Sequence, residues 1–186
     1  MLILGISGSL RRDSHNTRLL RAAVQSLPPG TRFAEFNELR AIPAFDEDRE
    51  DRPAAVVRRL RSAIALVDGV LISTPEYNNS IPGQLKNALD WVSRPFETNP
   101  LRAKPVAVLG ASTGLFGAVW AQADLRRVLE RIGADVLDEE LNVGQAEAAF
   151  DLRGDLADPA SDAALRELVG ALARAARGAD RAALAA

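Results

Sequence analysis

The first 27 residues place an apolar run, a hydroxyl-rich loop and a helical pattern next to one another, and this order constrains the fold. Residues 2–7 are nearly continuously apolar, which is typical of a strand buried on both faces of a sheet. Residues 17–27 carry apolar side chains at helical spacing and are followed by Pro28. A strand that leads through a short loop into a helix is the repeating unit of a parallel α/β sheet.

The same alternation continues along the chain. Further strands are expected at residues 32–36, 69–74 and 105–109 and from residue 134, and further helices at residues 53–67, 82–92, 118–132 and 159–177. Residues 41–52 are irregular and acidic. Five strands alternating with five helices predict a parallel sheet with helices on both faces. We expect a single domain over residues 1–186.

Composition excludes several classes of function. The formal net charge is −2 and there is no basic run, which argues against binding to nucleic acid or to an anionic membrane. The absence of cysteine excludes disulfides and thiolate metal sites. The N-terminus does not resemble a secretory signal, so we expect a cytoplasmic protein. The acidic residues between positions 46 and 51 are expected to be solvated rather than to bind a metal.

Three loops that follow strands have unusual composition: residues 8–16, 75–82 and 110–117. The carboxyl ends of parallel strands lie at one edge of a sheet, and ligands of open α/β sheets bind there. We therefore expect the three loops to form a single cleft.

The first loop is rich in groups that bind phosphate. Ser9, Arg11, Ser14 and Asn16 supply donors beside a helix N-terminus, which favours an anion. Ser14 and Asn16 are also good helix caps, so an ordinary capped helix is the alternative interpretation. Arg11 favours the phosphate site, because a helix N-terminus disfavours a cation unless an anion is present. The sole histidine, His15, is expected near the phosphate or at the surface rather than as a catalytic base.

The second and third loops suit a flat ligand. Tyr77, the only tyrosine, can pack on a planar ring while Asn78 meets its polar edge, although an ordinary polar turn explains the same residues. The glycines of residues 110–117 allow close approach of the backbone, or simply form a flexible connection. A phosphate at the first loop with a flat heteroaromatic between the other two matches flavin mononucleotide (FMN). No base–nucleophile pair for hydrolysis is visible.

Two longer motifs resemble a known family. Residues 8–16 (GSLRRDSHN) are similar to the GSLRxxSxN loop of the NADPH-dependent FMN reductases, which have a flavodoxin-like fold and include bacterial quinone, chromate and azo-dye reductases. Residues 75–91 (PEYNNSIPGQLKNALDW) look like that family's PEYNxSxPGxLKNAxDW signature. Residues 110–112 and 121–126 resemble its third element. The resemblance extends over residues 1–175.

The resemblance implies a three-layer flavodoxin-like sandwich with strand order 2-1-3-4-5, and it assigns the site. The phosphate would be held by the first loop, and the ring and ribityl chain would lie between the second and third. The residues expected to bind FMN are Ser9, Arg11, Ser14, His15, Asn16, Pro75, Glu76, Tyr77, Asn78, Ser112 and Gly114. Backbone N–H groups of residues 110–114 are expected to stabilise the reduced ring.

The implied activity passes a hydride from NADPH or NADH to FMN and then electrons to a small-molecule acceptor such as a quinone, without a catalytic side chain. Two alternatives remain at this point: an electron carrier of the flavodoxin type that does not oxidise NAD(P)H, and a phosphate-ligand binder that has lost flavin. The resemblance also implies a homodimer or homotetramer in which the helix containing Trp91 takes part in subunit packing.

The chain departs from the family pattern at two positions. Many members have a Gly-Gly-x-Arg-Ala-Gln run, whereas this chain has Trp120 in place of the arginine. Ala103 stands where glycine is usual before Lys104 and Pro105. The first departure replaces a cation by an indole beside the third loop, so the contacts of that position are expected to differ.

Overall fold

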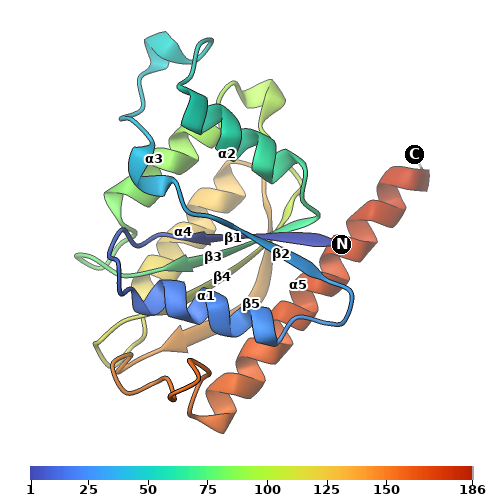
Figure 1. Ribbon diagram of the computed structural model, residues 1–186. Helices are drawn as coiled ribbons and strands as arrows, with labels where there is room; N and C mark the ends of the chain where they lie inside the picture. Colours follow the sequence, from blue (N-terminus) through green and yellow to red (C-terminus); the bar gives the residue numbers. More distant parts are fainter. Residues whose placement is uncertain (186) are drawn as a thin grey trace.

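The computed structural model describes residues 1–185, and the side chains of residues 1–179. The strands are β1 (Leu2–Ser7), β2 (Arg32–Phe36), β3 (Gly69–Thr74), β4 (Pro105–Ala111) and β5 (Asp135–Val143). They are all parallel and lie in the order β2-β1-β3-β4-β5. Their carboxyl ends are on the left in Figure 1. The parallel sheet predicted from the alternation, and the strand order implied by the resemblance, are both confirmed.

Five α-helices cover the two faces of the sheet (Figure 1). They are α1 (His15–Gln25), α2 (Ala55–Ala65), α3 (Gly83–Val92), α4 (Val119–Arg131) and α5 (Pro159–Ala185). The helices α1 and α5 pack on one face, and α2, α3 and α4 pack on the other. The last helix continues to Ala185, beyond the expected end near residue 177. None of the helices within residues 1–185 has the length and apolarity needed to span a membrane.

The core consists of two apolar layers separated by the sheet. In β3, Leu71 faces the layer formed with α1 and α5, while its neighbours Val70 and Ile72 face the layer formed with α2, α3 and α4. All three side chains are fully buried. Burial on both faces explains why the central strands are continuous apolar runs in the sequence.

The edge strand β5 is longer than its sequence pattern indicates. Its second half contains Asp138, Glu139 and Glu140, and their charges conceal the strand from a search for apolar residues. The ladder with β4 is irregular between Val106 and Val108. There the guanidinium of Arg126, on α4, donates to the carbonyl oxygens of Asp138 and Glu139 at 3.1 and 2.7 Å. These contacts satisfy carbonyl groups at the irregular part of the strand.

The side chain of Trp91 packs inside its own subunit, and the contact of its helix, α3, with a second subunit stays a prediction. The residue is 3% exposed, and its indole meets the ring of Phe45 edge-on at 5.0 Å between centroids. Its Nε1–H donates to the carbonyl oxygen of Pro43 at 2.9 Å. Trp91 is therefore part of the subunit's own core, where it holds the irregular segment after β2 against α3.

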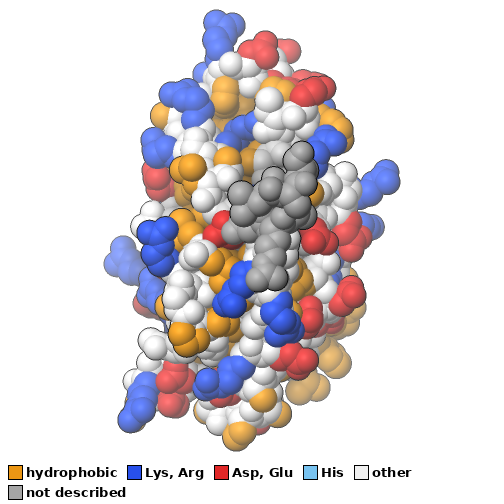
Figure 2. All heavy atoms as spheres, turned by 90° about the vertical axis from the view of Figure 1, so that its right-hand side faces the viewer, with side chains coloured by type: hydrophobic (Ala, Val, Ile, Leu, Met, Phe, Trp, Pro, Cys, Tyr) orange, Lys and Arg blue, Asp and Glu red, His pale blue; other side chains and the backbone are white. Residues whose placement is uncertain are grey.

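The edge of the molecule opposite the carboxyl ends of the strands mixes acidic, basic and apolar side chains (Figure 2). Such a surface is typical of a protein of small net charge. The chemically unusual loops lie at the other edge.

Candidate functional site: a cleft at the ends of β1, β3 and β4

The three unusual loops meet in one cleft at the carboxyl edge of the sheet, as the sequence predicts. Its lining residues are Ser9, Arg11, Ser14, His15, Asn16, Pro75, Glu76, Tyr77, Ala111, Ser112 and Thr113. All the residues predicted for the site are among them except Asn78 and Gly114. Arg11, from the first loop, and Tyr77, from the second, therefore line one shared hollow.

Two serine hydroxyls in the first loop are arranged to donate to an anion. Ser14 Oγ caps α1 by accepting from the backbone N–H groups of Asn16 and Thr17 at 3.1 and 3.4 Å. Ser9 Oγ accepts from the backbone N–H of Arg11 at 3.3 Å. Because each oxygen already accepts from the backbone, its hydroxyl proton is left for a ligand in the cleft. The cap also explains why α1 begins at His15 rather than at Thr17, where its apolar periodicity starts.

Asn16 connects the first loop to the two central strands. Its Nδ2 donates to the carbonyl oxygen of Ala111 at 2.8 Å, and its Oδ1 accepts from the Ala111 N–H and the Ser73 hydroxyl, both at 2.9 Å. The side chain is 2% exposed. Asn16 is thus at the back of the cleft, where its amide holds α1 against the ends of β3 and β4.

His15 also lines the cleft and is the first residue of α1. Burial, the nearby guanidiniums of Arg11 and Arg18, and the weaker opposite effect of Glu147 combine to lower its pKa below the usual 6.5. Its Nδ1 is buried and has no hydrogen-bond partner among the described residues. The ring lies parallel to that of Phe150, with centroids 6.4 Å apart. A buried ring nitrogen without a partner is unusual in a folded protein.

The second loop contributes Pro75, Glu76 and Tyr77 to the cleft. The Glu76 carboxylate is held in place by two hydrogen bonds, because one of its oxygens accepts from the backbone N–H groups of Trp120 and Ala121, both at 3.0 Å. The carboxylate thereby caps α4, where the helix dipole favours a negative charge. The Tyr77 side chain is half exposed and available to a planar ring.

Asn78 lies outside the cleft because it forms a tight turn. Tyr77 and Ser80 exchange two backbone hydrogen bonds of 3.0 and 3.1 Å across it. Asn78 and Asn79 occupy its two central positions with φ of 52° and 58°, a left-handed conformation that asparagine tolerates well. The polar-turn interpretation of the sequence therefore fits the two asparagines, while the ligand interpretation fits Tyr77.

Two glycines of the third loop are packed closely against the neighbouring backbone. A Cβ on Gly110 would lie 2.9 Å from the carbonyl oxygen of Thr74, so a larger residue would push β4 and β3 apart. Gly117 has a φ of 61°, and a Cβ there would lie 2.5 Å from the backbone of Asn142. Ser112 and Thr113 line the cleft, whereas Gly114 lies beyond it, where its carbonyl oxygen accepts from the N–H of Gln145 at 2.9 Å.

Backbone N–H groups of the third loop are only partly available to a ligand. The N–H of Ala111 donates to Asn16, and that of Ser112 donates to the carbonyl oxygen of Val143 at 3.0 Å. Those of Thr113 and Gly114 have no partner among the described residues. Of the backbone N–H groups in this loop that were expected to act as donors, only those of Thr113 and Gly114 are therefore unpaired among the described residues.

Trp120, the residue that replaces the family's arginine, stands on the rim beside Glu76. Its indole is 49% exposed and meets the ring of Phe116 edge-on at 5.4 Å between centroids. The rim of the cleft is thus aromatic at this point rather than cationic.

Sequence reasoning missed Ala111, Thr113 and Phe150. Ala111 and Thr113 adjoin Ser112. Because β4 was expected to end at residue 109, the sequence did not distinguish these two residues from the rest of the loop that follows. Phe150 gave no signal, since it belongs to an irregular segment 135 positions from His15 and is brought to it only by the fold.

The donor set of the cleft fits FMN. The first loop offers two free hydroxyl protons and the Arg11 guanidinium to a phosphate. Tyr77 and the backbone of the third loop border the remainder, which suits a flat ring. The cleft is therefore polar at one end and suited to an aromatic ligand at the other.

Comparison with known proteins gives the same result. Residues 1–148 match the family model described as NADPH-dependent FMN reductase. The chain is 44% identical over 159 residues to an NAD(P)H-dependent FMN reductase from Pseudomonas aeruginosa, with 84% of each chain covered. It is 38% identical over 152 residues to a 2-hydroxy-1,4-benzoquinone reductase from a Burkholderia species, covering 81% of this chain and 82% of the relative.

A solved structure extends the likeness to three dimensions. The flavoenzyme FerB, an NAD(P)H:(acceptor) oxidoreductase from Paracoccus denitrificans, superposes with a TM-score of 0.86 at 32% identity, covering 95% of this chain and 97% of that one. The motifs, the strand order, the cleft and the matched sequence all agree. The chain belongs to the family of NADPH-dependent FMN reductases.

Proposed function

We propose that this protein is an FMN-dependent oxidoreductase that oxidises NADPH or NADH and reduces a small-molecule acceptor such as a quinone. The observation that carries the proposal is the shared cleft of Arg11 and Tyr77, because it joins phosphate donors to a half-exposed aromatic ring. Relatives 37–44% identical to this chain are named FMN reductase and quinone reductase, which supports the same activity.

In this proposal the residues of the cleft divide by chemistry. Ser9, Arg11 and Ser14 hold the phosphate of FMN, while Pro75 and Tyr77 border its ring. Bound FMN would supply the hydride-accepting and electron-donating chemistry, and the protein binds it, orients it and adjusts its electronics. The N–H of Thr113, which lines the cleft, is the candidate for stabilising negative charge on the reduced ring.

No side chain is assigned as a catalytic acid or base. Glu76 is occupied in capping α4, and burial together with the guanidiniums of Arg11 and Arg18 lowers the pKa of His15. Hydride transfer to the flavin needs no proton from a side chain.

The test is to load the purified protein with FMN, remove oxygen, and add NADPH or NADH while recording the visible absorbance of the flavin. We expect bleaching, followed by recovery of the absorbance when benzoquinone is added. Uptake of FMN without bleaching would favour an electron carrier of the flavodoxin type. Failure to take up FMN would favour a phosphate-ligand binder that has lost flavin.

We also propose that the protein is a homodimer or homotetramer. Large apolar side chains are exposed at the rim of the cleft, where Leu115 is 70%, Phe116 59% and Trp120 49% exposed. Replacing Phe116 and Trp120 by serine should then lower the mass measured by analytical ultracentrifugation. An unchanged mass would show that subunits associate elsewhere, and a monomeric parent protein would contradict the proposal.

A further inference from the structure

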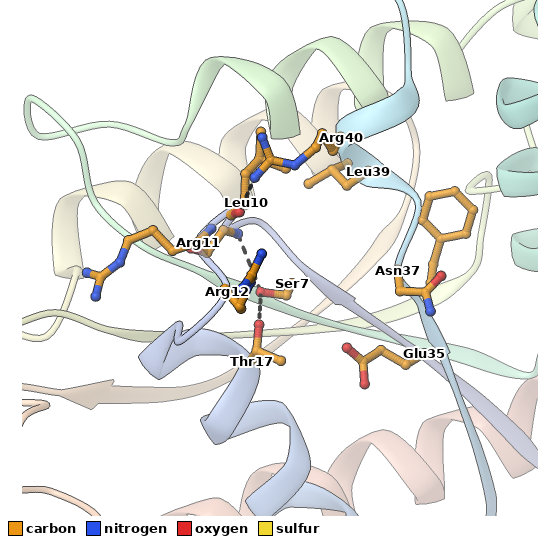
Figure 3. Close-up of a pocket in the computed structure, with 11 residues that line it drawn as sticks. Ser7, Leu10, Arg11, Arg12, Thr17, Glu35, Asn37, Leu39 and Arg40 are labelled. Atoms are coloured by element: carbon orange, nitrogen blue, oxygen red, sulfur yellow. Dashed lines mark hydrogen bonds between the residues drawn. The ribbon is translucent and has the colours of Figure 1, made fainter.

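A second hollow lies on the other side of the first loop, between the carboxyl ends of β1 and β2 (Figure 3). Its lining residues are Ser7, Ser9, Leu10, Arg11, Arg12, Thr17, Glu35, Phe36, Asn37, Leu39 and Arg40. Ser9 and Arg11 also line the cleft assigned to FMN, so the two hollows lie on either side of the same loop. Sequence reasoning assigned no role to this hollow.

The charges of the second hollow favour a dianion. The lining contains three arginines, Arg11, Arg12 and Arg40, and one carboxylate, that of Glu35, so its formal charge is +2. Figure 3 shows the Arg11 side chain extending away from Glu35, which leaves Arg12 and Arg40 as the cations of this hollow. The Glu35 carboxylate lies 3.7 Å from the Arg21 guanidinium, which further offsets its negative charge. The Arg40 guanidinium donates to the carbonyl oxygen of Leu10 and so stands against the loop. Arginine side chains gathered in this way match the charge and geometry of a phosphate group.

Arg12 is not used by the rest of the fold. Its guanidinium has no hydrogen bond or ion pair with any described residue. It is also absent from the lining of the flavin cleft, where Ser9, Arg11 and Ser14 already serve the single phosphate of FMN. The loop therefore holds more arginine than one phosphate requires.

A carboxylate and an amide beside the arginines narrow the class of ligand. Glu35 and Asn37 line the same hollow as Arg12 and can accept hydrogen bonds from hydroxyl groups. Figure 3 shows Glu35 and Asn37 on the side of the hollow facing Arg12. A phosphorylated ribose needs groups that donate to its phosphate and, opposite them, groups that accept from its hydroxyls. This hollow offers both.

We propose that this hollow binds the phosphorylated adenosine ribose of NADPH, with Arg12 and Arg40 on its 2′-phosphate. The inference rests on the proposed function, because NADPH, a reductant in that function, carries a 2′-phosphate in addition to the phosphate that FMN itself brings. It assigns to these two arginines the preference for NADPH over NADH.

The opposite flank of the loop suits this ligand less well. A further hollow there includes Arg18 and Arg21, but the Arg18 guanidinium lies over the ring of Phe150 at 4.6 Å and Arg21 faces Glu35. Asp13 and Glu147 also line it. Arg12 lines this hollow as well. What distinguishes the hollow is its two carboxylates and the contacts that Arg18 and Arg21 already make, which leave less of its positive charge for a phosphate.

The test measures binding rather than turnover. FMN-loaded protein is titrated by calorimetry with adenosine 2′,5′-bisphosphate and with adenosine 5′-monophosphate, and the flavin spectrum is recorded throughout. We expect the bisphosphate to bind at least about tenfold more tightly, as one well-placed charged contact allows. Arg12→Ala and Arg40→Ala should each remove about tenfold of that advantage and leave the monophosphate within about twofold.

Arg131→Ala is the matched control, because Arg131 is exposed in the last turn of α4, at the opposite edge of the sheet. It should change neither affinity. Equal binding of the two nucleotides, release of FMN by the bisphosphate, or a larger loss in Arg18→Ala than in Arg12→Ala would overturn the inference. Those results would leave the proposed function intact if NADH still bleaches the flavin, so the two failures are distinguishable.

Discussion

Asn16 and Ala111 exchange two hydrogen bonds, from Asn16 Nδ2 to the Ala111 carbonyl oxygen at 2.8 Å and from the Ala111 N–H to Asn16 Oδ1 at 2.9 Å. An amide side chain thereby takes the place of a neighbouring strand at the end of β4. It connects the phosphate loop to the third loop through a single buried residue. The relative position of the two ends of the cleft therefore depends on this pair.

Asn16→Ala should lower the free energy of unfolding by about 2–4 kcal/mol, because it leaves the buried N–H and carbonyl of Ala111 without partners. Denaturant unfolding of the FMN-free protein measures the loss. Gln25→Ala removes an exposed amide from the same helix and should change stability by less than about 0.5 kcal/mol. Equal losses in the two variants would show that the pair with Ala111 contributes little.

This pair also shows how far sequence reasoning reaches. The type of residue at position 16 indicated a polar role beside a helix start, and that was correct. Its partners lie 57 and 95 positions away, in β3 and β4, and no local pattern identifies them. Helical and strand periodicities arise from neighbours along the chain, so they predicted the layers and the edge of the sheet where the cleft lies.

The remaining differences have the same origin. Periodicity placed the start of α1 at Thr17, whereas a side-chain cap from Ser14 determines it. The charges of β5 hid its second half, since an edge strand exposes polar side chains that resemble a loop. The role inferred for Arg12 depends on Glu35, in β2, and on Arg40, which follows β2. Both lie next to the first loop only because β1 and β2 are paired.

Ser14 separates helix capping from phosphate binding. Ser14→Asp should keep the cap on α1, because aspartate accepts from backbone N–H groups as well as serine does. It should nevertheless weaken FMN binding at least about tenfold, since a carboxylate repels the phosphate. Thermal unfolding of the FMN-free protein and fluorescence titration with FMN measure the two effects.

Ser14→Asn is the neutral control for that experiment. Asparagine caps equally well and carries no charge, so FMN affinity should fall less than in Ser14→Asp. If both variants bind FMN like the parent protein, the phosphate lies away from Ser14 and the assignment of the first loop is wrong.

FMN binding should be accompanied by proton uptake at His15. Without ligand, burial and the guanidiniums of Arg11 and Arg18 hold the pKa of His15 below 6.5, so its contribution to folding is present above pH 6.5 and is lost as the pH falls through the lowered value. A phosphate dianion beside the ring raises that pKa again. Below pH 6.5, binding should therefore take up a fraction of a proton at His15.

Calorimetric titration with FMN in two buffers of different ionisation enthalpy measures this uptake. The phosphate of FMN itself titrates with a pKa of about 6, so the comparison with His15→Gln is required. The variant should show less proton uptake than the parent protein at the same pH. Identical uptake in both proteins would place the phosphate too far from His15 to affect it.

Gly110 and Gly83 form a matched pair that tests how tightly the cleft is built. A Cβ at Gly110 would lie 2.9 Å from the Thr74 carbonyl oxygen and 3.0 Å from Gln122 Nε2, so Gly110→Ala should cost about 1–3 kcal/mol of unfolding free energy. A Cβ at Gly83, the first residue of α3, meets nothing within 4 Å, so Gly83→Ala should stabilise the protein by up to about 1 kcal/mol.

Because Gly110 adjoins the third loop, FMN affinity should fall with stability in Gly110→Ala and stay constant in Gly83→Ala. Denaturant unfolding and FMN titration of both variants measure the contrast. A Gly110→Ala variant as stable as Gly83→Ala would mean that the ends of β3 and β4 separate easily, in which case the cleft would not hold a flat ring by close backbone approach.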